Sequence, residues 1–292
     1  MTLKEKLKSK KFVVTCEIGP PKGTNVDKIL QQAAILKGKV DAVNVTDLQS
    51  SVMRLGSLVT CYLLKTRGHE PIFQLTTRDR NRLALQSDIL SAAVLGIENV
   101  LALTGDHPSK GDHPQAKPVY DLDSIQLLDA IKLLNSGVDM TGNELDGKTD
   151  IFAGAVLNPG ADPIEPEIIK MEKKLISGAE FFQTQAVFDI EKFAKFLKKV
   201  KHIKAPILAG VILLKSPAMA RYMNENVAGI DVPDTIIKEI SSVDKQDMEK
   251  KSIEIAARTI KELKTLCAGV HIMPLGWESK VLSLLNAAGE KD

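Results

Sequence analysis

Eight short apolar runs alternate with amphipathic stretches along almost the whole chain, and this alternation limits the fold more than any other feature. The apolar residues within each run are nearly continuous, which is typical of strands buried on both faces and therefore of a parallel sheet. The predicted strands are residues 12–17, 41–46, 71–76, 98–104, 151–157, 180–185, 206–213 and 270–275.

The stretches between these runs have apolar residues at helical spacing. The predicted helices are residues 26–37, 55–67, 80–95, 123–134, 165–177, 190–201, 216–226, 247–266 and 277–288. Eight strands that alternate with helices predict an α/β fold, a single (β/α)8 TIM-type barrel. Because no stretch has the composition of a linker, we expect residues 1–292 to form one domain.

The competing architecture is a doubly wound open sheet. Such a sheet usually has a glycine-rich phosphate loop after its first strand. Here the first strand runs into Gly19, Pro20 and Pro21, and neither GxGxxG nor GxxxxGK[ST] occurs in a strand-to-helix turn. The barrel is therefore favoured.

Composition and charge exclude several classes of function. A net charge of +2 provides no field that would gather nucleic acid or an anionic membrane. No apolar run approaches the roughly 20 residues of a membrane span, and the basic N-terminal segment lacks the apolar core of a secretory signal. The cysteines, Cys16, Cys61 and Cys267, are isolated and form no CxxC pair. We therefore expect a cytoplasmic protein with reduced thiols and no zinc site or iron–sulfur cluster of its own.

Polar residues end six of the predicted strands. In a barrel these ends converge on one mouth, where barrel enzymes keep their active sites. Each residue alone has a structural explanation, such as a turn cap, but six polar ends at one mouth predict a functional site. The long loop 105–122 follows a strand and belongs to the same face. The strand-end residues are Glu17, Thr46, Asp47, Gln74, Thr104, Asp106, Asn158, Gln183 and Gln185.

Three other chemistries receive little support. His107 and His113 flank acidic residues in the long loop, but no third histidine lies nearby, so we expect no metal site. There is no GxSxG motif for a nucleophilic serine. No lysine occupies the centre of a predicted strand, where a Schiff-base lysine would lie.

In their order along the chain, several segments resemble the methylenetetrahydrofolate reductase family, flavin-dependent barrel enzymes of one-carbon metabolism. The likeness covers nearly the full chain, and the ordered set is more specific than any single piece. The matching segments are CEIGPPKG, VNVTD, LALTGDHP, GAVLNPGADP, EIIKMEKKLISGAEFFQTQAVFD and GVHIMPLGWESKVLSLL.

The resemblance implies that the chain reduces 5,10-methylenetetrahydrofolate to 5-methyltetrahydrofolate. Glu17 matches the general acid that opens the imidazolidine ring to a 5-iminium cation, which then accepts a hydride from N5 of reduced flavin. A general acid working at neutral pH needs a carboxyl pKa well above ~4.3, which burial at an apolar strand end favours. Asp106 matches an aspartate near the flavin and the pterin, where its charge has an electrostatic role. Gln185 matches a glutamine that contacts folate and flavin.

The resemblance implies FAD as the cofactor and leaves FMN open. The helix predicted from residue 165 has four charged residues at spacings that place them on one face, which a solvated helix would also explain. The cofactor-binding residues implied are Thr46, Gln74, Thr104, Gly105, Asp106, Asn158, Glu167, Lys170, Lys173, Lys174 and Gln185.

Three departures from the family pattern leave the electron donor open. Gln74 stands where many members have histidine, and Thr104 where many have arginine. After the seventh strand, LLKSPAMA lacks the aromatic residue on which family members stack the nicotinamide. Phe188 or Tyr120 could replace it. The donor is therefore either NADH or NADPH, or a partner subunit that carries iron–sulfur clusters.

Two other readings also remain open: a folate-binding barrel methyltransferase, and a non-catalytic folate-binding subunit of a larger complex. Neither requires a flavin, whereas a ring-opening acid at Glu17 fits only the reductase. The oligomeric state is open as well.

Overall fold

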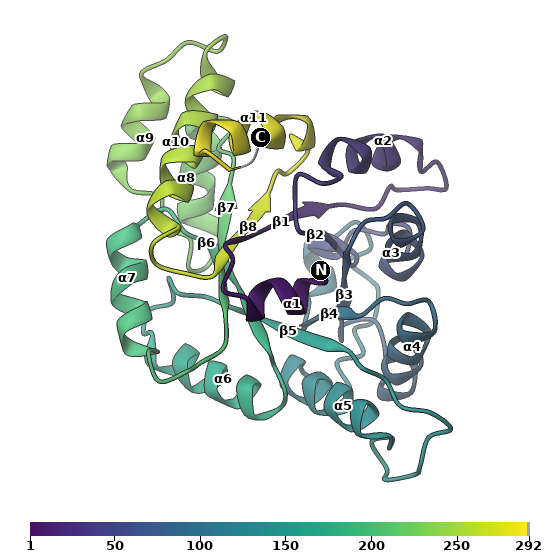
Figure 1. The fold of residues 1–292 in the computed structure, drawn as a ribbon. Coiled ribbons are helices and arrows are strands. Elements are labelled where there is room, and N and C mark those ends of the chain that lie inside the picture. The colour runs from purple at the N-terminus through teal and green to yellow at the C-terminus, as the bar shows by residue number, and fades with distance from the viewer. Residues whose placement is uncertain (291–292) are drawn as a thin grey trace.

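The computed structural model describes residues 1–290 and contains a closed barrel of eight parallel strands, ordered β1 to β8 around the ring (Figure 1). The predicted (β/α)8 fold is thereby confirmed, and each strand lies within two residues of its predicted bounds. The assignment of residues 1–292 to one domain stays a prediction, and residues 291–292 lie outside the described residues. The strands are β1 (Val13–Ile18), β2 (Ala42–Val45), β3 (Pro71–Thr76), β4 (Asn99–Leu103), β5 (Phe152–Leu157), β6 (Phe181–Ala186), β7 (Ile207–Ile212) and β8 (Gly269–Met273).

The helices surround the barrel (Figure 1). Nine were predicted: α2 (Asp27–Leu36), α3 (Ser57–Lys65), α4 (Arg82–Val94), α5 (Ser124–Ser136), α6 (Glu165–Ile176), α7 (Ile190–Lys199), α8 (Pro217–Asn226), α10 (Met248–Leu263) and α11 (Val281–Ala288). Two were not: α1 (Leu3–Lys8) and α9 (Asp234–Ser241). Short 3₁₀ turns occur at Gln49–Ser51, Pro108–Lys110 and Glu278–Lys280. None of the helices within residues 1–290 is long and apolar enough to cross a membrane.

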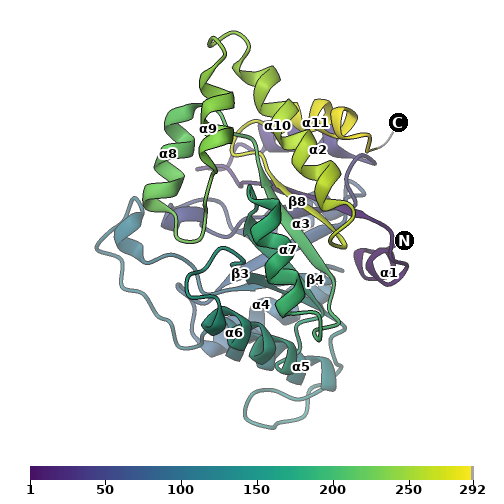
Figure 2. The same ribbon diagram turned by 90° about the vertical axis from the view of Figure 1, so that its left-hand side faces the viewer.

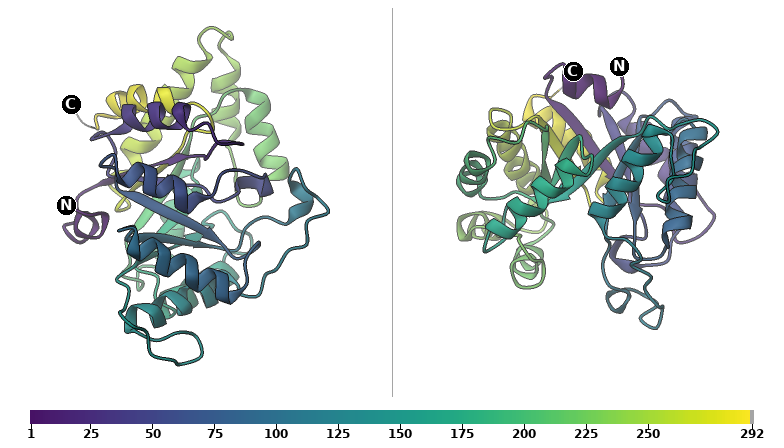
Figure 3. Two further views of the ribbon diagram at one scale, coloured as in Figure 1. Left: turned by 90° about the vertical axis from the view of Figure 1, so that its right-hand side faces the viewer. Right: turned by 90° about the horizontal axis from the view of Figure 1, so that it is seen from below.

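Helix α1 closes the N-terminal end of the barrel, and the site lies at the other end. Leu3 and Leu7 of this helix are buried and pack with Val13, Phe152 and Leu208 from strands β1, β5 and β7. Figure 2 shows α1 on one side of the barrel and the loop after β4 on the opposite side. The same loop projects beyond the ring of helices in Figure 3. The carboxyl ends of the strands are therefore the open end.

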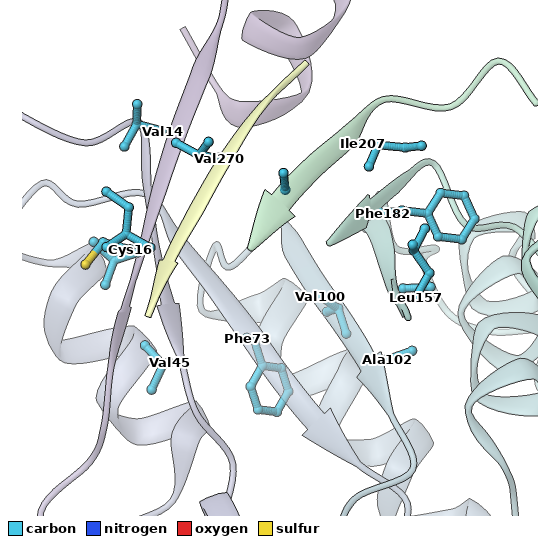
Figure 4. Packing of buried hydrophobic residues seen from close by; sticks show 14 of the residues in the cluster. Val14, Cys16, Val45, Phe73, Val100, Ala102, Leu157, Phe182, Ile207 and Val270 are labelled. Atoms are coloured by element: carbon cyan, nitrogen blue, oxygen red, sulfur yellow. The ribbon is translucent and has the colours of Figure 1, made fainter. Parts of the chain in front are cut away.

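The main apolar core lies between the strands and the surrounding helices. All eight strands contribute side chains to it (Figure 4). On β1 the core residues are Val14 and Cys16, so the alternate residues Thr15 and Glu17 face the barrel interior. This alternation turns Glu17, the residue that ends the predicted first strand, toward the centre of the barrel.

Side chains are closely packed in the barrel interior around Gly154 of β5, toward the end that α1 closes. A Cβ added there would lie 2.2 Å from Cζ of Phe181, and that ring is stacked on Phe152 at 5.0 Å between centroids. We expect Gly154→Ala to lower the free energy of unfolding by about 1–3 kcal/mol, because the ring must leave its rotamer. Urea denaturation measures this. Gly23→Ala is the control, since a Cβ at Gly23 meets nothing within 4 Å. Equal stability of the two variants would contradict close packing at this layer.

Candidate active site

A cavity of about 610 Å³ opens where the carboxyl ends of the strands meet. Its size is typical of a small-molecule site. Because the strand ends converge there, side chains from distant parts of the sequence share one space. Twelve residues predicted from the sequence line it: Glu17, Asp47, Gln74, Thr104, Gly105, Asp106, Asn158, Glu167, Lys170, Lys174, Gln183 and Gln185.

Two of the predicted residues do not line the cavity. Thr46 is buried at the end of β2, and its hydroxyl has no hydrogen-bond partner among the described residues. Lys173 is exposed on α6 and points elsewhere. Lys174 is buried beside it, and its Nζ donates a hydrogen bond of 2.6 Å to the carbonyl oxygen of Val156. Burial lowers the pKa of Lys174. Of the four charged residues that the spacing placed on one face of α6, the cavity is lined by Glu167, Lys170 and Lys174 but not by Lys173.

Glu17 has a nearly buried side chain, 13% exposed, among neutral donors. The amide Nε2 of Gln74 donates to its Oε1 at 3.4 Å, and Nε2 of Gln49 lies 3.5 Å from its Oε2. On the other side, Nε2 of His271 is 3.7 Å from Oε1. The sequence predicted Gln74 as a cofactor contact, and the structure places its amide against Glu17.

His271 is oriented by a chain of hydrogen bonds inside the barrel. Its Nδ1 lies 3.0 Å from Oγ1 of Thr15, and that oxygen accepts a bond of 3.3 Å from Nε2 of Gln183. The same hydroxyl donates a hydrogen bond of 3.4 Å to the carbonyl oxygen of Val270, so the contact with Thr15 fixes the orientation of the His271 ring. Nε2 of the ring lies on the side of Glu17.

Gln183 is held in turn by Asn44. Nδ2 of Asn44 donates to Oε1 of Gln183 at 2.8 Å, and Nε2 of Gln183 donates back to Oδ1 of Asn44 at 3.1 Å. Both side chains are buried. Paired amides of this kind leave no buried polar group unsatisfied and hold one arrangement of the network.

The sequence analysis did not predict Thr15, Asn44 or His271, although each interrupts an apolar run. It placed Gln183 among the strand-end residues, and the side chain lines the floor of the cavity, 1% exposed. The signal available was alternation: Thr15 lies two residues before Glu17, so both face the interior.

Gln185 is directed by an irregularity in β6. The register between β6 and β7 shifts between Gln183 and Ala186, and bulges of this kind re-aim side chains. Oε1 of Gln185 accepts a bond of 3.1 Å from the backbone N–H of Ala186. Gly210 on β7 makes the shift sterically feasible, because a Cβ there would lie 2.6 Å from the carbonyl oxygen of Thr184.

Asp47 is a structural carboxylate. Its Oδ2 accepts bonds from the backbone N–H of Thr76 at 2.9 Å and from the Thr76 hydroxyl at 2.8 Å. Nη1 of Arg80 donates to the same oxygen at 2.7 Å. With its acceptor sites occupied, Asp47 ties the ends of β2 and β3 together, which agrees with the structural explanation allowed for any one strand-end residue.

Asp106 lies at the mouth, with its side chain 50% exposed. Oδ1 is 3.7 Å from Nζ of Lys110, a solvated pair that leaves the carboxylate charge largely unopposed. Gly105 precedes it with a φ of 89°, which glycine adopts without strain. A Cβ at Gly105 would also press within 3.3 Å of Arg78.

Neither aromatic substitute proposed from the sequence reaches the cavity. Phe188 is 7% exposed and packed in a satellite core with Leu214 and Ile212. The Tyr120 hydroxyl donates to the carbonyl oxygen of Gly105 at 3.4 Å, and Tyr120 is not a lining residue. Within residues 1–290, no Phe, Tyr or Trp lines the cavity. The same part of the chain contains no group of three or more His, Cys, Asp or Glu side chains that could hold a metal ion.

Known proteins resemble this chain in sequence and in fold. A family model described as methylenetetrahydrofolate reductase matches residues 2–289. A probable methylenetetrahydrofolate reductase (NADPH) of Caenorhabditis elegans is 22% identical over 259 residues, 85% of this chain and 36% of that protein. A 5,10-methylenetetrahydrofolate reductase of Pectobacterium carotovorum is 26% identical over 190 residues, 63% of this chain and 57% of that protein. The chain thus spans less than two thirds of the length of these relatives.

Among solved structures, an uncharacterized protein from Clostridium thermocellum superposes with a TM-score of 0.65 at 16% identity. The match covers 98% of this chain and 97% of that one. That protein is described as binding two copies of 5-methyl-5,6,7,8-tetrahydrofolic acid. At this identity the likeness establishes a shared fold.

Proposed function

Because this chain belongs to the methylenetetrahydrofolate reductase family, we propose that it reduces 5,10-methylenetetrahydrofolate to 5-methyltetrahydrofolate with a bound flavin. The observation that carries the proposal is Glu17, whose carboxyl group faces the barrel interior near the end of β1. It accepts a hydrogen bond from Gln74 and lies beside His271. The folate ligand of the Clostridium thermocellum neighbour supports a folate substrate for this cavity.

The residues of the cavity fit a flavin. Polar groups from several strand ends line the cavity, among them the side-chain amides of Gln74 and Gln185, as in sites that fix a ligand by a few polar contacts. Lys170 reaches the cavity from α6, where a cation suits a phosphate. Gln74 and Gly105, which line the cavity, would hold the flavin, and Lys170 its phosphate. We propose FAD, with Glu167 toward the adenosine end. Reconstitution with FAD and with FMN in separate samples identifies the cofactor.

In the proposed reaction, one residue donates a proton and others stabilise the charges that form. Glu17 donates its proton to N10 of the folate, so the five-membered ring opens to the 5-iminium cation. Reduced flavin, when bound, would supply the hydride that the methylene carbon of the iminium cation accepts. Nε2 of His271 lies 3.7 Å from Oε1 of Glu17, and when it carries a proton it stabilises the carboxylate that remains on Glu17. Asp106 contributes a negative charge at the mouth that favours the cation, and Gln185 orients the folate.

The visible spectrum of the purified protein tests this assignment. A flavoprotein shows flavin absorbance near one flavin per chain, either as purified or after incubation with FAD. A colourless protein that takes up neither FAD nor FMN would exclude the reductase. If the flavin-free protein still bound 5-methyltetrahydrofolate, the result would favour a methyltransferase or a non-catalytic folate-binding subunit.

For the electron donor, we propose a partner subunit that carries iron–sulfur clusters. The support is the absence of Phe, Tyr and Trp from the cavity lining within residues 1–290. A nicotinamide held without aromatic stacking loses roughly 1 kcal/mol of contact energy, about a fivefold weakening of binding.

We therefore expect the isolated flavoprotein to react slowly with NADH and with NADPH in anaerobic stopped-flow mixing. Photoreduction of the same sample is the control, because it shows that the flavin itself is reducible. Full bleaching by either nucleotide within a turnover time, with no partner present, would contradict the donor proposal and leave the reductase assignment intact.

A further inference from the structure

Arg78 is the largest of the fully buried side chains within residues 1–290, 1% exposed, although it lies two residues after the end of β3, at the mouth of the barrel. Its Nε donates to Oδ1 of Asp79 at 2.9 Å and its Nη2 to Oδ2 at 2.7 Å. This two-bond fork fixes the plane of the guanidinium group. The proposed proton and charge chemistry makes no use of Arg78, yet its side chain lines the cavity.

The other N–H groups of Arg78 bind two different loops. Nη1 donates to the carbonyl oxygen of Asp106 at 3.0 Å, and Nη2 donates to the carbonyl oxygen of Leu48 at 3.3 Å. These carbonyls belong to the loops after β4 and β2, which flank the end of β3. Burial lowers the pKa of Arg78, but the hydrogen bonds to Asp79 and the charges of Asp79, Asp47 and Tyr120 together outweigh burial and raise it, so the guanidinium keeps its charge.

The loop after β2 needs such support because its backbone is strained. Leu48, Ser50 and Ser51 have φ values of 46°, 55° and 59°, a left-handed conformation that costs roughly 1 kcal/mol or more for each residue other than glycine. Strained segments persist where the surrounding structure fixes them. Gln49 lies within this segment, and its amide faces Glu17.

The loop after β4 presses on the same segment. A Cβ added at Gly111 would lie 1.8 Å from the carbonyl oxygen of Ser51. Asp112 accepts a bond of 3.0 Å from the backbone N–H of Met53 and pairs with Lys22. The two loops are therefore packed together on their outer side and tied by Arg78 on their inner side.

We propose that Arg78 is a positioning residue that locks these two loops together, so that Gln49 stays against Glu17 and Asp106 keeps its place at the mouth. The locking itself is independent of the reaction, whereas its consequence for turnover rests on the proposed function.

The test compares Arg78→Lys with the parent protein by amide hydrogen exchange. Lysine keeps the charge but lacks the planar fork that serves Asp79 and both carbonyls at once. We expect exchange in residues 48–53 and 105–112 to quicken together by about fivefold or more, the equivalent of one lost hydrogen bond of about 1 kcal/mol. Exchange in the strands should stay unchanged. Asp79→Asn, which removes one arm of the fork, should act in the same direction.

Arg258→Lys is the matched control, because Arg258 also makes a two-bond fork with a carboxylate: its Nη1 and Nη2 donate to Glu239, between α10 and α9, at 3.1 and 2.7 Å. It should quicken exchange in neither loop. A second readout is a double-mutant cycle: the loss of turnover caused by Arg78→Lys should shrink in a Gln49→Ala background, because both act through the same contact.

Quickened exchange in only one loop, in neither, or throughout the barrel would overturn the proposal. Additive effects of Arg78→Lys and Gln49→Ala on turnover would also overturn it. If the parent protein binds no flavin or turns over no folate, the proposed function fails, and the exchange experiment still decides whether Arg78 locks the loops.

Discussion

Glu17→Gln is expected to lower folate turnover by a factor of about 10² or more, the range of general-acid catalysis, while the flavin stays bound. Glutamine keeps the shape of the side chain and its contacts with Gln74 and His271, but its amide protons are not acidic enough to be transferred to N10. A donor dye should still reduce the flavin at the parental rate. Steady-state turnover and dye-driven flavin reduction, measured on one sample, separate the two steps.

Glu254→Gln on α10 is the control, because Glu254 makes an exposed pair with Lys251. It removes the same charge far from the cavity and should leave turnover unchanged. Near-normal turnover in Glu17→Gln would mean that Glu17 is a structural charge and that another group protonates the folate.

Asp106→Asn has the second largest expected effect. The flavin midpoint potential should rise, because the carboxylate no longer opposes the negative charge of the reduced flavin. Folate turnover should fall by about tenfold or more, since the cation that forms on the folate loses a stabilising charge. A redox titration against a reference dye and a steady-state assay measure the two effects.

The control for this charge change is Asp129→Asn, an exposed position on α5. An unchanged potential in Asp106→Asn would show that solvent screens the carboxylate from the flavin. In that case Asp106, half exposed and paired with Lys110, would be an ordinary surface charge with no role in the reaction.

The strands and most helices were predictable because their signal is local. Continuous apolar runs and helical spacing persist over enough residues to be recognised without tertiary information. The two helices that were missed are short: α1 has six residues and α9 eight. Over so few residues the helical period is barely repeated. Helix α1 is stabilised by the burial of Leu3 and Leu7 against the barrel, which the sequence does not display.

The lining of the cavity was predictable from strand ends, but the partners of each residue were not. The alternation along β1 already directed Glu17 inward. Its contacts come from Gln74 on β3 and His271 on β8, and the pairing exists only after the barrel closes. Likewise, the phase of α6 decides that Lys174 is buried and Lys173 exposed, and adjacent lysines do not reveal that phase.

Arg78 was the least predictable part of the site. In the sequence, Arg78 and Arg80 stand beside Asp79 in a segment typical of a charged turn. The side chain is buried because loops from two neighbouring strands offer it carbonyl oxygens, at Leu48 and Asp106. A contact of this kind depends on loop conformation, which local patterns do not describe.

The most direct test of the proposed activity is a single half-reaction. The purified flavoprotein is photoreduced without oxygen and mixed with 5,10-methylenetetrahydrofolate, with no nucleotide or partner present. The proposed function predicts that flavin absorbance returns and that one 5-methyltetrahydrofolate forms for each flavin reoxidised. A flavin that stays reduced in the presence of bound folate would contradict it.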